Sequence, residues 1–207
     1  MNNLIFVGPP GSGKGTQANF LKKHDYRHIS TGDLLREEVK SGTPLGEEIN
    51  SIISKGDLVS DEIVGKLLRS NLDLDNHVYI FDGYPRNKNQ ARILKEIIGD
   101  KPFKVIVFDA DLPKIMERIC NRRLAPKSGE IYNLVSRPPK RDGFCDVSGE
   151  ELIHREDDKI EIVENRFKVY GDTKSEIINF YGPSMTAYVD ADKEPSVVYE
   201  ELVKNIN

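Results

Sequence analysis

The sequence predicts an α/β fold, with a central five-stranded parallel sheet covered by helices on both faces and two small inserted lobes. Three observations predict it. Short apolar runs alternate with segments of helical period, the runs are hydrophobic throughout, and a glycine-rich loop follows the first run. Such alternation is typical of α/β domains, and continuous hydrophobicity is typical of strands that are covered on both faces.

The candidate strands and helices follow in chain order. The strands are expected at residues 4–7, 28–30 as the end of a short strand, 78–81, 105–108 and 185–189. Helical segments are expected at residues 16–23, 61–72 and 112–122, among others. In the last of these, the apolar side chains share an inner face, which leaves Arg118 and Arg122, four residues apart, together on another face.

Two stretches interrupt the simple alternation. Residues 31–59, the first lobe, hold two helix-like pieces separated by the turn signal SGTP, and residues 123–158, the second lobe, are rich in proline and glycine. So many helix-breaking residues predict turns and short strands in the second lobe. Because long structureless loops are unusual in compact domains, both stretches are expected to be small lobes built onto the core, where a lid would lie.

The composition excludes several classes of protein. Thirty basic and 34 acidic side chains give a net charge of −4, so no overall field draws the chain to nucleic acid or to an anionic membrane. No apolar run approaches the roughly 20 residues of a membrane-spanning helix. The two cysteines, Cys120 and Cys145, fit a reducing compartment better than a disulfide scaffold, and we expect a cytoplasmic protein.

The stretch GPPGSGKGT at residues 8–16 predicts a phosphate-binding loop between the first strand and the first helix. Gly8, Gly11, Gly13 and Gly15 are expected to permit positive φ and close approach, and Lys14 to add a positive charge. A plain turn with an exposed lysine is the simpler alternative. Against it, a glycine in the first helical turn costs up to ~1 kcal/mol relative to alanine and needs a local reason.

Asp82 is the candidate partner for a magnesium ion. It ends the apolar run in VYIFDGYPR, residues 78–86, and in phosphate-loop enzymes a carboxylate at this place faces the metal directly or through water. The alternative is an ordinary turn, since Asp-Gly is a strong turn pair. The residues alone do not decide between the two.

Arginines gather at the predicted ligand edge and in the two lobes. A phosphoryl-transfer site needs fixed positive charge, and planar guanidinium groups bind phosphate oxygens in pairs. Any one of these arginines is equally well explained as a solvated surface residue, but together with the loop they favour phosphate chemistry. They are Arg36, Arg86, Arg118, Arg122, Arg155 and Arg166.

Five ordered motifs resemble those of the adenylate kinase family, in its form with a long lid, over nearly the whole chain. They are GPPGSGKGTQA at 8–18, STGDLLR at 30–36, DGYPRNKNQA at 82–91, RICNRR at 118–123 and GEELIHREDD at 149–158. In that family a Gly-Thr pair follows the lysine, as Gly15 and Thr16 do here. The resemblance implies a P-loop kinase core at 1–29, 60–121 and 159–207, an AMP-binding lobe at 30–59 and a lid at 122–158.

The resemblance also implies the reaction of MgATP with AMP to give two ADP, by a monomer that needs no zinc, nucleic acid or membrane. Catalysis would be positioning and charge stabilisation by Lys14, Arg86, Arg122, Arg155 and Arg166. The ATP site implied by the motifs comprises Gly11, Ser12, Gly13, Lys14, Gly15, Thr16, Arg118, Arg122 and Lys193.

On the AMP side, the resemblance implies that Arg36 and Arg86 hold the phosphate and that Thr31 and Gln90 contact the adenine. Thr31 is also a candidate N-cap of the helix that follows. The remaining AMP-binding positions implied are Asp57, Leu58, Val59, Gly83, Tyr84, Pro85, Arg155 and Arg166.

Zinc-binding members of the family carry four lid ligands, and the corresponding positions here are Ala125, Ser128, Cys145 and Ser148. Tetrahedral zinc needs four ligands, so we expect no zinc site and expect Cys145 to lie in a packed or hydrogen-bonded hairpin. Asn87 and Asn133 depart from the residues common in the family. A kinase for UMP/CMP or GMP, or a non-catalytic nucleotide-binding switch, are the alternative functions.

Overall fold

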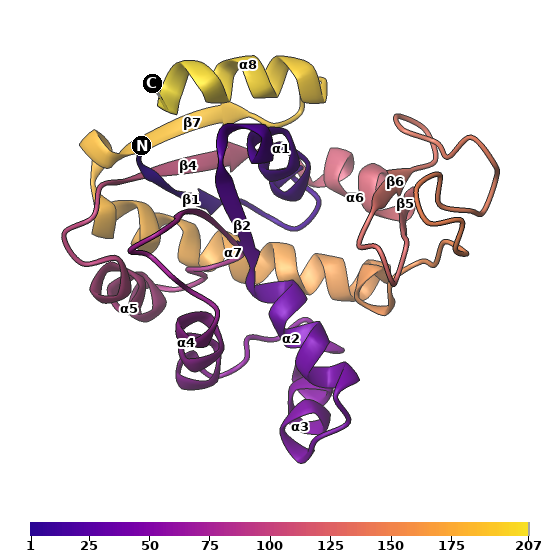
Figure 1. The fold of residues 1–207 in the computed structure, drawn as a ribbon, viewed down its shortest axis with the longest axis horizontal. Helices are drawn as coiled ribbons and strands as arrows, with labels where there is room; N and C mark the ends of the chain where they lie inside the picture. Colours follow the sequence, from indigo (N-terminus) through magenta and orange to yellow (C-terminus); the bar gives the residue numbers. More distant parts are fainter. Residues whose placement is uncertain (207) are drawn as a thin grey trace.

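The computed structural model describes residues 1–206, and its centre is a five-stranded sheet (Figure 1). The strands are β1 (Asn3–Val7), β2 (Tyr26–Ser30), β3 (Val78–Asp82), β4 (Phe103–Asp109) and β7 (Thr186–Asp190), in the order β2-β3-β1-β4-β7. Every pairing in this sheet is parallel. The predicted fold class is confirmed, and each predicted run lies in or overlaps a strand.

Helices cover both faces of the sheet because successive strand residues point to opposite sides. On one face, α1 (Lys14–Leu21) and α8 (Pro195–Ile206) pack against Leu4 and Phe6. On the other, α4 (Asp61–Ser70), α5 (Lys88–Ile98) and α7 (Ile160–Tyr181) pack against Ile5 and Val7. Short 3₁₀ turns η1 (Lys22–His24) and η3 (Pro183–Met185) join helices to strands. No helix in the described part of the chain has the length and apolar character needed to cross a bilayer.

The first lobe consists of two helices, α2 (Thr31–Lys40) and α3 (Pro44–Ile53), as the sequence predicts. Each has a side-chain N-cap: Ser30 Oγ accepts from the Asp33 amide, and Thr43 Oγ1 accepts from the Gly46 amide. A Cβ at Gly46 would lie 2.5 Å from the Glu38 carbonyl oxygen, so glycine is what lets the two helices approach. Thr31 is the first helical residue rather than the cap, and its predicted N-cap role is wrong.

The second lobe is made of short strands and turns, as predicted. The strands β5 (Arg122–Leu124) and β6 (Ile131–Asn133) pair antiparallel, and isolated bridges join Leu124 to Ile153 and Phe144 to Glu151. A single 3₁₀ turn, η2 (Glu156–Asp158), leads into α7. Figure 1 shows this lobe extending from the core beyond α6 (Leu112–Cys120).

The helix predicted at residues 112–122 is two residues too long. α6 ends at Cys120, Asn121 is its C-cap, and Arg122 already belongs to β5, where it pairs with Asn133. Arg118 and Arg122 therefore do not share a helix face, and that prediction is wrong. Strand pairing within the second lobe overrides the local preference for helix.

Candidate active site

The carboxyl ends of β1, β3 and β2 meet at one edge of the sheet. In register, Asp82 lies opposite Phe6 of β1 and Ser30 of β2, so the glycine-rich loop, Asp82 and the start of α2 converge. Ligands of open parallel sheets bind outside this edge. The candidate active site is built here.

The glycine-rich loop has a left-handed backbone at its centre. Gly11 and Gly13 have φ values of 76° and 87°, and Gly13 directly precedes α1. Gly8 and Gly15 do not have positive φ, so that part of the prediction is wrong. A Cβ at Gly8 would lie 2.9 Å from the Phe108 Cβ, a close approach that explains glycine there, whereas one at Gly15 would meet nothing closer than 3.7 Å. Close approach of phosphate to Gly15 stays a prediction.

Lys14 begins α1 and folds back over the loop. Its Nζ donates to the carbonyl oxygens of Gly8 at 2.9 Å and Pro9 at 2.7 Å and lies 3.3 Å from Ser12 Oγ. Burial, opposed by Asp82 and assisted by nearby arginines, lowers the pKa of the ammonium to about 8. Phosphate oxygens carry charge and are stronger acceptors than these carbonyls, so the lysine is placed to bind them.

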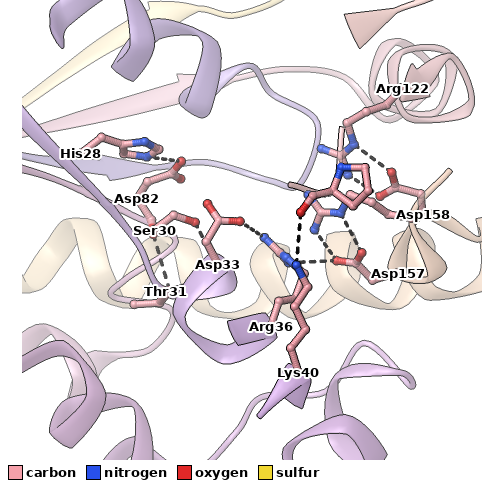
Figure 2. Close-up of polar contacts among 12 residues, drawn as sticks. His28, Ser30, Thr31, Asp33, Arg36, Lys40, Asp82, Arg122, Asp157 and Asp158 are labelled. Atoms are coloured by element: carbon pink, nitrogen blue, oxygen red, sulfur yellow. Dashed lines mark hydrogen bonds and ion pairs between the residues drawn. The ribbon is translucent and has the colours of Figure 1, made fainter. Parts of the chain in front are cut away.

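Asp82 lies beside the loop and is held from β2. His28 Nε2 is 3.1 Å from Asp82 Oδ2 (Figure 2). Burial raises the pKa of Asp82, but the hydrogen bond with His28 and the charge of Lys14 outweigh it, and the pKa lies below its usual value. Among residues 1–206, the other carboxylate oxygen of Asp82, Oδ1, has no hydrogen-bond partner. A buried, ionised carboxylate with one free oxygen fits the role of a magnesium partner through water.

An open cavity of about 550 Å³, including space continuous with solvent, lies beside Asp82 between the first lobe and the sheet edge. Most of the predicted AMP-binding residues line it: Thr31, Arg36, Asp57, Leu58, Val59, Gly83, Arg86, Gln90 and Arg166. Three predicted residues, Tyr84, Pro85 and Arg155, do not line it. Tyr84 is instead buried in the core beneath the cavity, with 1% of its surface exposed.

Two predicted adenine contacts are fixed by protein hydrogen bonds. Thr31 Oγ1 donates to the Gly83 carbonyl oxygen at 2.9 Å. The Gln90 amide donates through Nε2 to Asp61 Oδ1 at 2.9 Å, and its Oε1 accepts from the Arg86 backbone amide at 2.8 Å. Since an amide group has two donors and two acceptor positions, one of each stays available on Gln90.

Asn87, a departure from the family pattern, has a structural role at this point. It is the N-cap of α5, where its Oδ1 accepts from the Gln90 backbone N–H at 2.8 Å. Its Nδ2 donates to Asp61 Oδ1 at 3.0 Å. Asn87 and Asp61 together fix the orientation of Gln90.

Arg36 and Arg86 reach the same cavity from different elements. Arg36, on α2, pairs with Asp33 and with Asp157 Oδ2, the latter at 3.5 Å (Figure 2). Arg86 follows β3, and its Nε donates to the Gly83 carbonyl oxygen at 2.9 Å. Burial lowers the pKa of Arg86 from its ordinary value. The cavity therefore has two guanidinium groups at its wall, as an anion site requires.

The remaining arginines of the predicted transfer site are held by two consecutive carboxylates. Asp157 accepts from Arg155 Nη2 at 2.6 Å and from Arg166 Nη1 at 3.1 Å, and Asp158 pairs with Arg122 through two hydrogen bonds. Burial and the neighbouring arginines lower the pKa of Arg166 to about 9. The lowered value reflects guanidinium groups crowded together away from water.

Arg118 and Lys193 lie together, in a separate contact. Arg118 donates to the carbonyl oxygens of Ala191 at 2.6 Å and Lys193 at 3.4 Å, while Lys193 Nζ pairs with Glu201 at 2.5 Å. This contact joins α6 to the segment between β7 and α8. Neither residue pairs with the carboxylates that hold the other arginines.

The four lid positions considered for zinc lie close to one another. Cys145 Sγ is 3.7 Å from Ser128 Oγ, which is 3.5 Å from Ser148 Oγ, and Ala125 belongs to the same small hydrophobic cluster. Burial raises the pKa of Cys145, but hydrogen bonds from Ser148 and Tyr132 lower it to about 6. The prediction that Cys145 lies in a packed, hydrogen-bonded hairpin is confirmed. In the described part of the chain, no group of three or more His, Cys, Asp or Glu side chains could hold a metal ion.

Sequence reasoning missed the groups that hold the predicted site residues in place: His28, Asp33, Asp61, Asp157 and Asp158. The run HREDD at 154–158 gave a signal, because two carboxylates follow an arginine predicted to be functional. The other partners lie far apart in sequence, such as Arg36 and Asp157, and only the fold brings them together.

Comparison with known proteins gives a consistent result. A family model described as "Adenylate kinase" matches residues 6–185. The adenylate kinase of Thermosipho africanus is 42% identical over 188 residues, covering 88% of each chain. That of Thermosipho melanesiensis is 39% identical over 211 residues, covering 99% of each chain. That of Pyrococcus furiosus is 43% identical over 185 residues, covering 87% of this chain and 84% of the relative.

Proposed function

The chain belongs to the adenylate kinase family, and on that premise we propose how its residues carry out the family's reaction. The enzyme transfers the γ-phosphoryl group of ATP to AMP, giving two ADP. The observation that carries the proposal is the convergence of Lys14 and five arginines from separate elements at one edge of the sheet. Kinases for other monophosphates and a non-catalytic switch are not favoured by these relatives.

On the donor side, Lys14 binds the β and γ phosphates of ATP within the loop of Gly11, Ser12, Gly13, Gly15 and Thr16. Arg122, Arg155 and Arg166 surround the transferring group. Their fixed charges stabilise the charge that develops on the phosphoryl oxygens, and no covalent intermediate is needed. The contact between Arg118 and Lys193 forms the part of the site that receives the adenine of ATP.

On the acceptor side, Arg36 and Arg86 bind the phosphate of AMP in the cavity described above. Thr31 and Gln90 contact the adenine, and the backbone at residues 57–59 closes the cavity. Holding both nucleotides in line converts a bimolecular reaction into an effectively unimolecular one, which is a large part of catalysis by such enzymes.

We propose that Mg²⁺ acts with ATP and that Asp82 orients it through water. When bound, the ion neutralises charge on the phosphates during transfer. Asp82 suits this role because it is ionised, adjoins Lys14 and keeps one oxygen free of protein partners. His28 fixes the orientation of the carboxylate from behind.

The division into a core at 1–29, 60–121 and 159–207, an AMP-binding lobe at 30–59 and a lid at 122–158 is part of the proposal. A lid over the site would exclude water, which otherwise accepts the phosphoryl group. A monomer in the cytoplasm, without nucleic acid or membrane as partner, is proposed from the family resemblance and the net charge of −4.

The proposed roles are tested by Arg86→Ala, with Arg92→Ala as the matched control because Arg92 is exposed on the adjoining helix and bonds only Asn89. ADP formation is measured from ATP with AMP, GMP, CMP or UMP, with and without Mg²⁺. We expect AMP to be the best acceptor and Arg86→Ala to lower kcat about a hundredfold to a thousandfold, since a charge-stabilising donor is removed. Unchanged turnover in Arg86→Ala would contradict the proposed role.

A further inference from the structure

Asp157 is the carboxylate that the arginines of both substrate sites share. Its Oδ2 accepts from Arg155 at 2.6 Å, from Arg166 at 3.1 Å and from Arg36 at 3.5 Å, and its Oδ1 accepts from Arg155 Nε at 2.9 Å. Figure 2 shows the contact between Arg36 and Asp157. These arginines come from three parts of the fold: α2 of the first lobe, the end of the second lobe and α7 of the core.

The neighbouring carboxylates are not shared in this way. Within residues 1–206, Arg122 is the one arginine that the Asp158 side chain bonds, and Asp33 bonds Arg36 from a position where 63% of its side chain is exposed. Glu156, next in sequence to Asp157, points to solvent and pairs with Lys159 at 2.7 Å. Among residues 1–206, Asp157 is thus the one carboxylate that joins an arginine of the acceptor side to arginines of the donor side.

The electrostatics give this carboxylate a definite effect. Burial lowers the pKa of Arg166, the charges of Arg86, Arg122 and Arg155 add to that shift, and Asp157 acts in the opposite direction. Burial raises the pKa of Asp157, but Arg155, Arg166 and Arg36 outweigh it and hold that pKa far below its usual range. Asp157 therefore stays charged and offsets repulsion among guanidinium groups that would otherwise move apart.

We propose that Asp157 is a positioning residue that occupies the phosphate-binding donors of Arg36, Arg155 and Arg166 until the nucleotide phosphates arrive, keeping the arginines of both sites in place. This inference rests on the proposed function, which assigns those arginines to the phosphates. A carboxylate and a phosphate present the same kind of paired, charged oxygens to a guanidinium group, so the two compete for the same N–H groups.

Competition has two opposite effects, which separate this role from a purely structural one. Asp157 weakens the binding of every phosphate that enters, because the phosphate must take over its donors and lie near its charge. It also preserves the arrangement of arginines on which the transfer depends. Loss of the charge should therefore tighten binding and slow turnover at the same time.

The test compares Asp157→Asn with Glu156→Gln, which removes the same charge from the adjacent residue outside the arginine cluster. AMP binding is measured by calorimetry without ATP, so that no reaction occurs, and kcat and KM are measured in the complete reaction. We expect Asp157→Asn to lower the Kd of AMP about fivefold or more, from removal of a nearby like charge, and to lower kcat at least tenfold. Glu156→Gln should have the same Kd for AMP and the same kcat as the unsubstituted protein.

Weaker AMP binding together with lower kcat in Asp157→Asn would overturn the inference, since that pattern indicates structural damage. If Asp157→Asn does not fold, Asp157→Glu carries the test. It keeps the charge and displaces the carboxylate, so AMP affinity should stay the same while kcat falls, and loss of affinity would count against the proposal.

Arg36→Ala separates this inference from the proposed function. If Arg36→Ala leaves AMP binding unchanged, Arg36 does not hold the phosphate and the proposed function fails at that residue. If Arg36→Ala weakens binding but Asp157→Asn does not strengthen it, only the role of Asp157 is wrong.

Discussion

The core sheet and the second lobe are stabilised by different interactions. The core has two hydrophobic clusters, one on each face of the sheet, and its central strand, β1, is buried at every residue. The second lobe has a cluster of only four buried residues, Ala125, Tyr132, Cys145 and Leu152, and side-chain hydrogen bonds tie its turns together. Because this cluster is separate from the two clusters of the core, we expect the lobe to be able to lose order while the core stays folded.

The largest effect should come from a cavity in the core. Phe81, in β3, is fully buried between neighbouring strands. We expect Phe81→Ala to lower the free energy of unfolding by about 3–5 kcal/mol, the usual result of removing a buried aromatic ring, as measured by urea denaturation. Val135→Ala, at a site 68% exposed in the second lobe, is the control and should change it by less than about 0.5 kcal/mol. Similar values for the two variants would remove the contrast between the regions.

A matched pair of tyrosines gives a smaller effect that distinguishes the two kinds of interaction. In the second lobe, Tyr132 Oη accepts from the Asp146 amide at 2.8 Å and lies 3.5 Å from Cys145 Sγ. In the core, Tyr84 Oη is buried and has no hydrogen-bond partner within residues 1–206. We expect Tyr132→Phe to destabilise the lobe by about 1 kcal/mol, because the Asp146 amide loses its acceptor, the Tyr132 hydroxyl.

Tyr84→Phe should be neutral or stabilising, since it removes a buried hydroxyl that lacks a partner. Limited proteolysis reports on the lobe and urea denaturation on the core. If both substitutions changed the proteolysis rate of the lobe equally, the hydrogen bonds of Tyr132 would not be what stabilises the lobe.

The smallest effect is the response of the second lobe to acid. Burial raises the pKa of Glu150, but hydrogen bonds from the Ser128 and Lys127 amides and the Ser148 hydroxyl lower it to about 2. A carboxyl group whose pKa is depressed by folding stabilises the fold above its unfolded pKa of about 4.3 and loses that contribution as the pH falls through the folded value. We therefore expect amide exchange in the lobe to accelerate between about pH 4.3 and pH 2.

Glu150→Gln should remove this pH dependence. Exchange that accelerates equally in the Glu150→Gln variant would assign the effect to other carboxylates.

The fold was predictable because its signal is local. Continuous hydrophobicity located β1, β3 and β4, and the glycines around Lys14 located the loop, since both patterns reflect burial and backbone geometry within a few residues. The end of α6 was not predictable in the same way. Nothing in RICNRR shows that Arg122 pairs with Asn133, because that pairing depends on the second lobe as a whole.

The candidate site was predictable for its cations and not for their partners. Phosphate chemistry requires arginine and lysine, so a motif containing them indicates a function on its own. Asp157 and His28 act through geometry that links distant parts of the chain, such as Arg36 with Asp157 and His28 with Asp82. Their residue types are common. The run HREDD places Asp157 near an arginine predicted to be functional but does not indicate its contact with Arg36, and no spacing along the sequence marks His28.

The two cysteines allow the difference between core and lobe to be measured by thiol labelling. Cys120, at the exposed end of α6, is open to a thiol reagent at all times, whereas Cys145 is enclosed in the small cluster of the second lobe. Opening of the lobe exposes the Cys145 thiol to the reagent. The rate of labelling at Cys145, with Cys120 as an internal reference, therefore measures local opening of the lobe without any added probe.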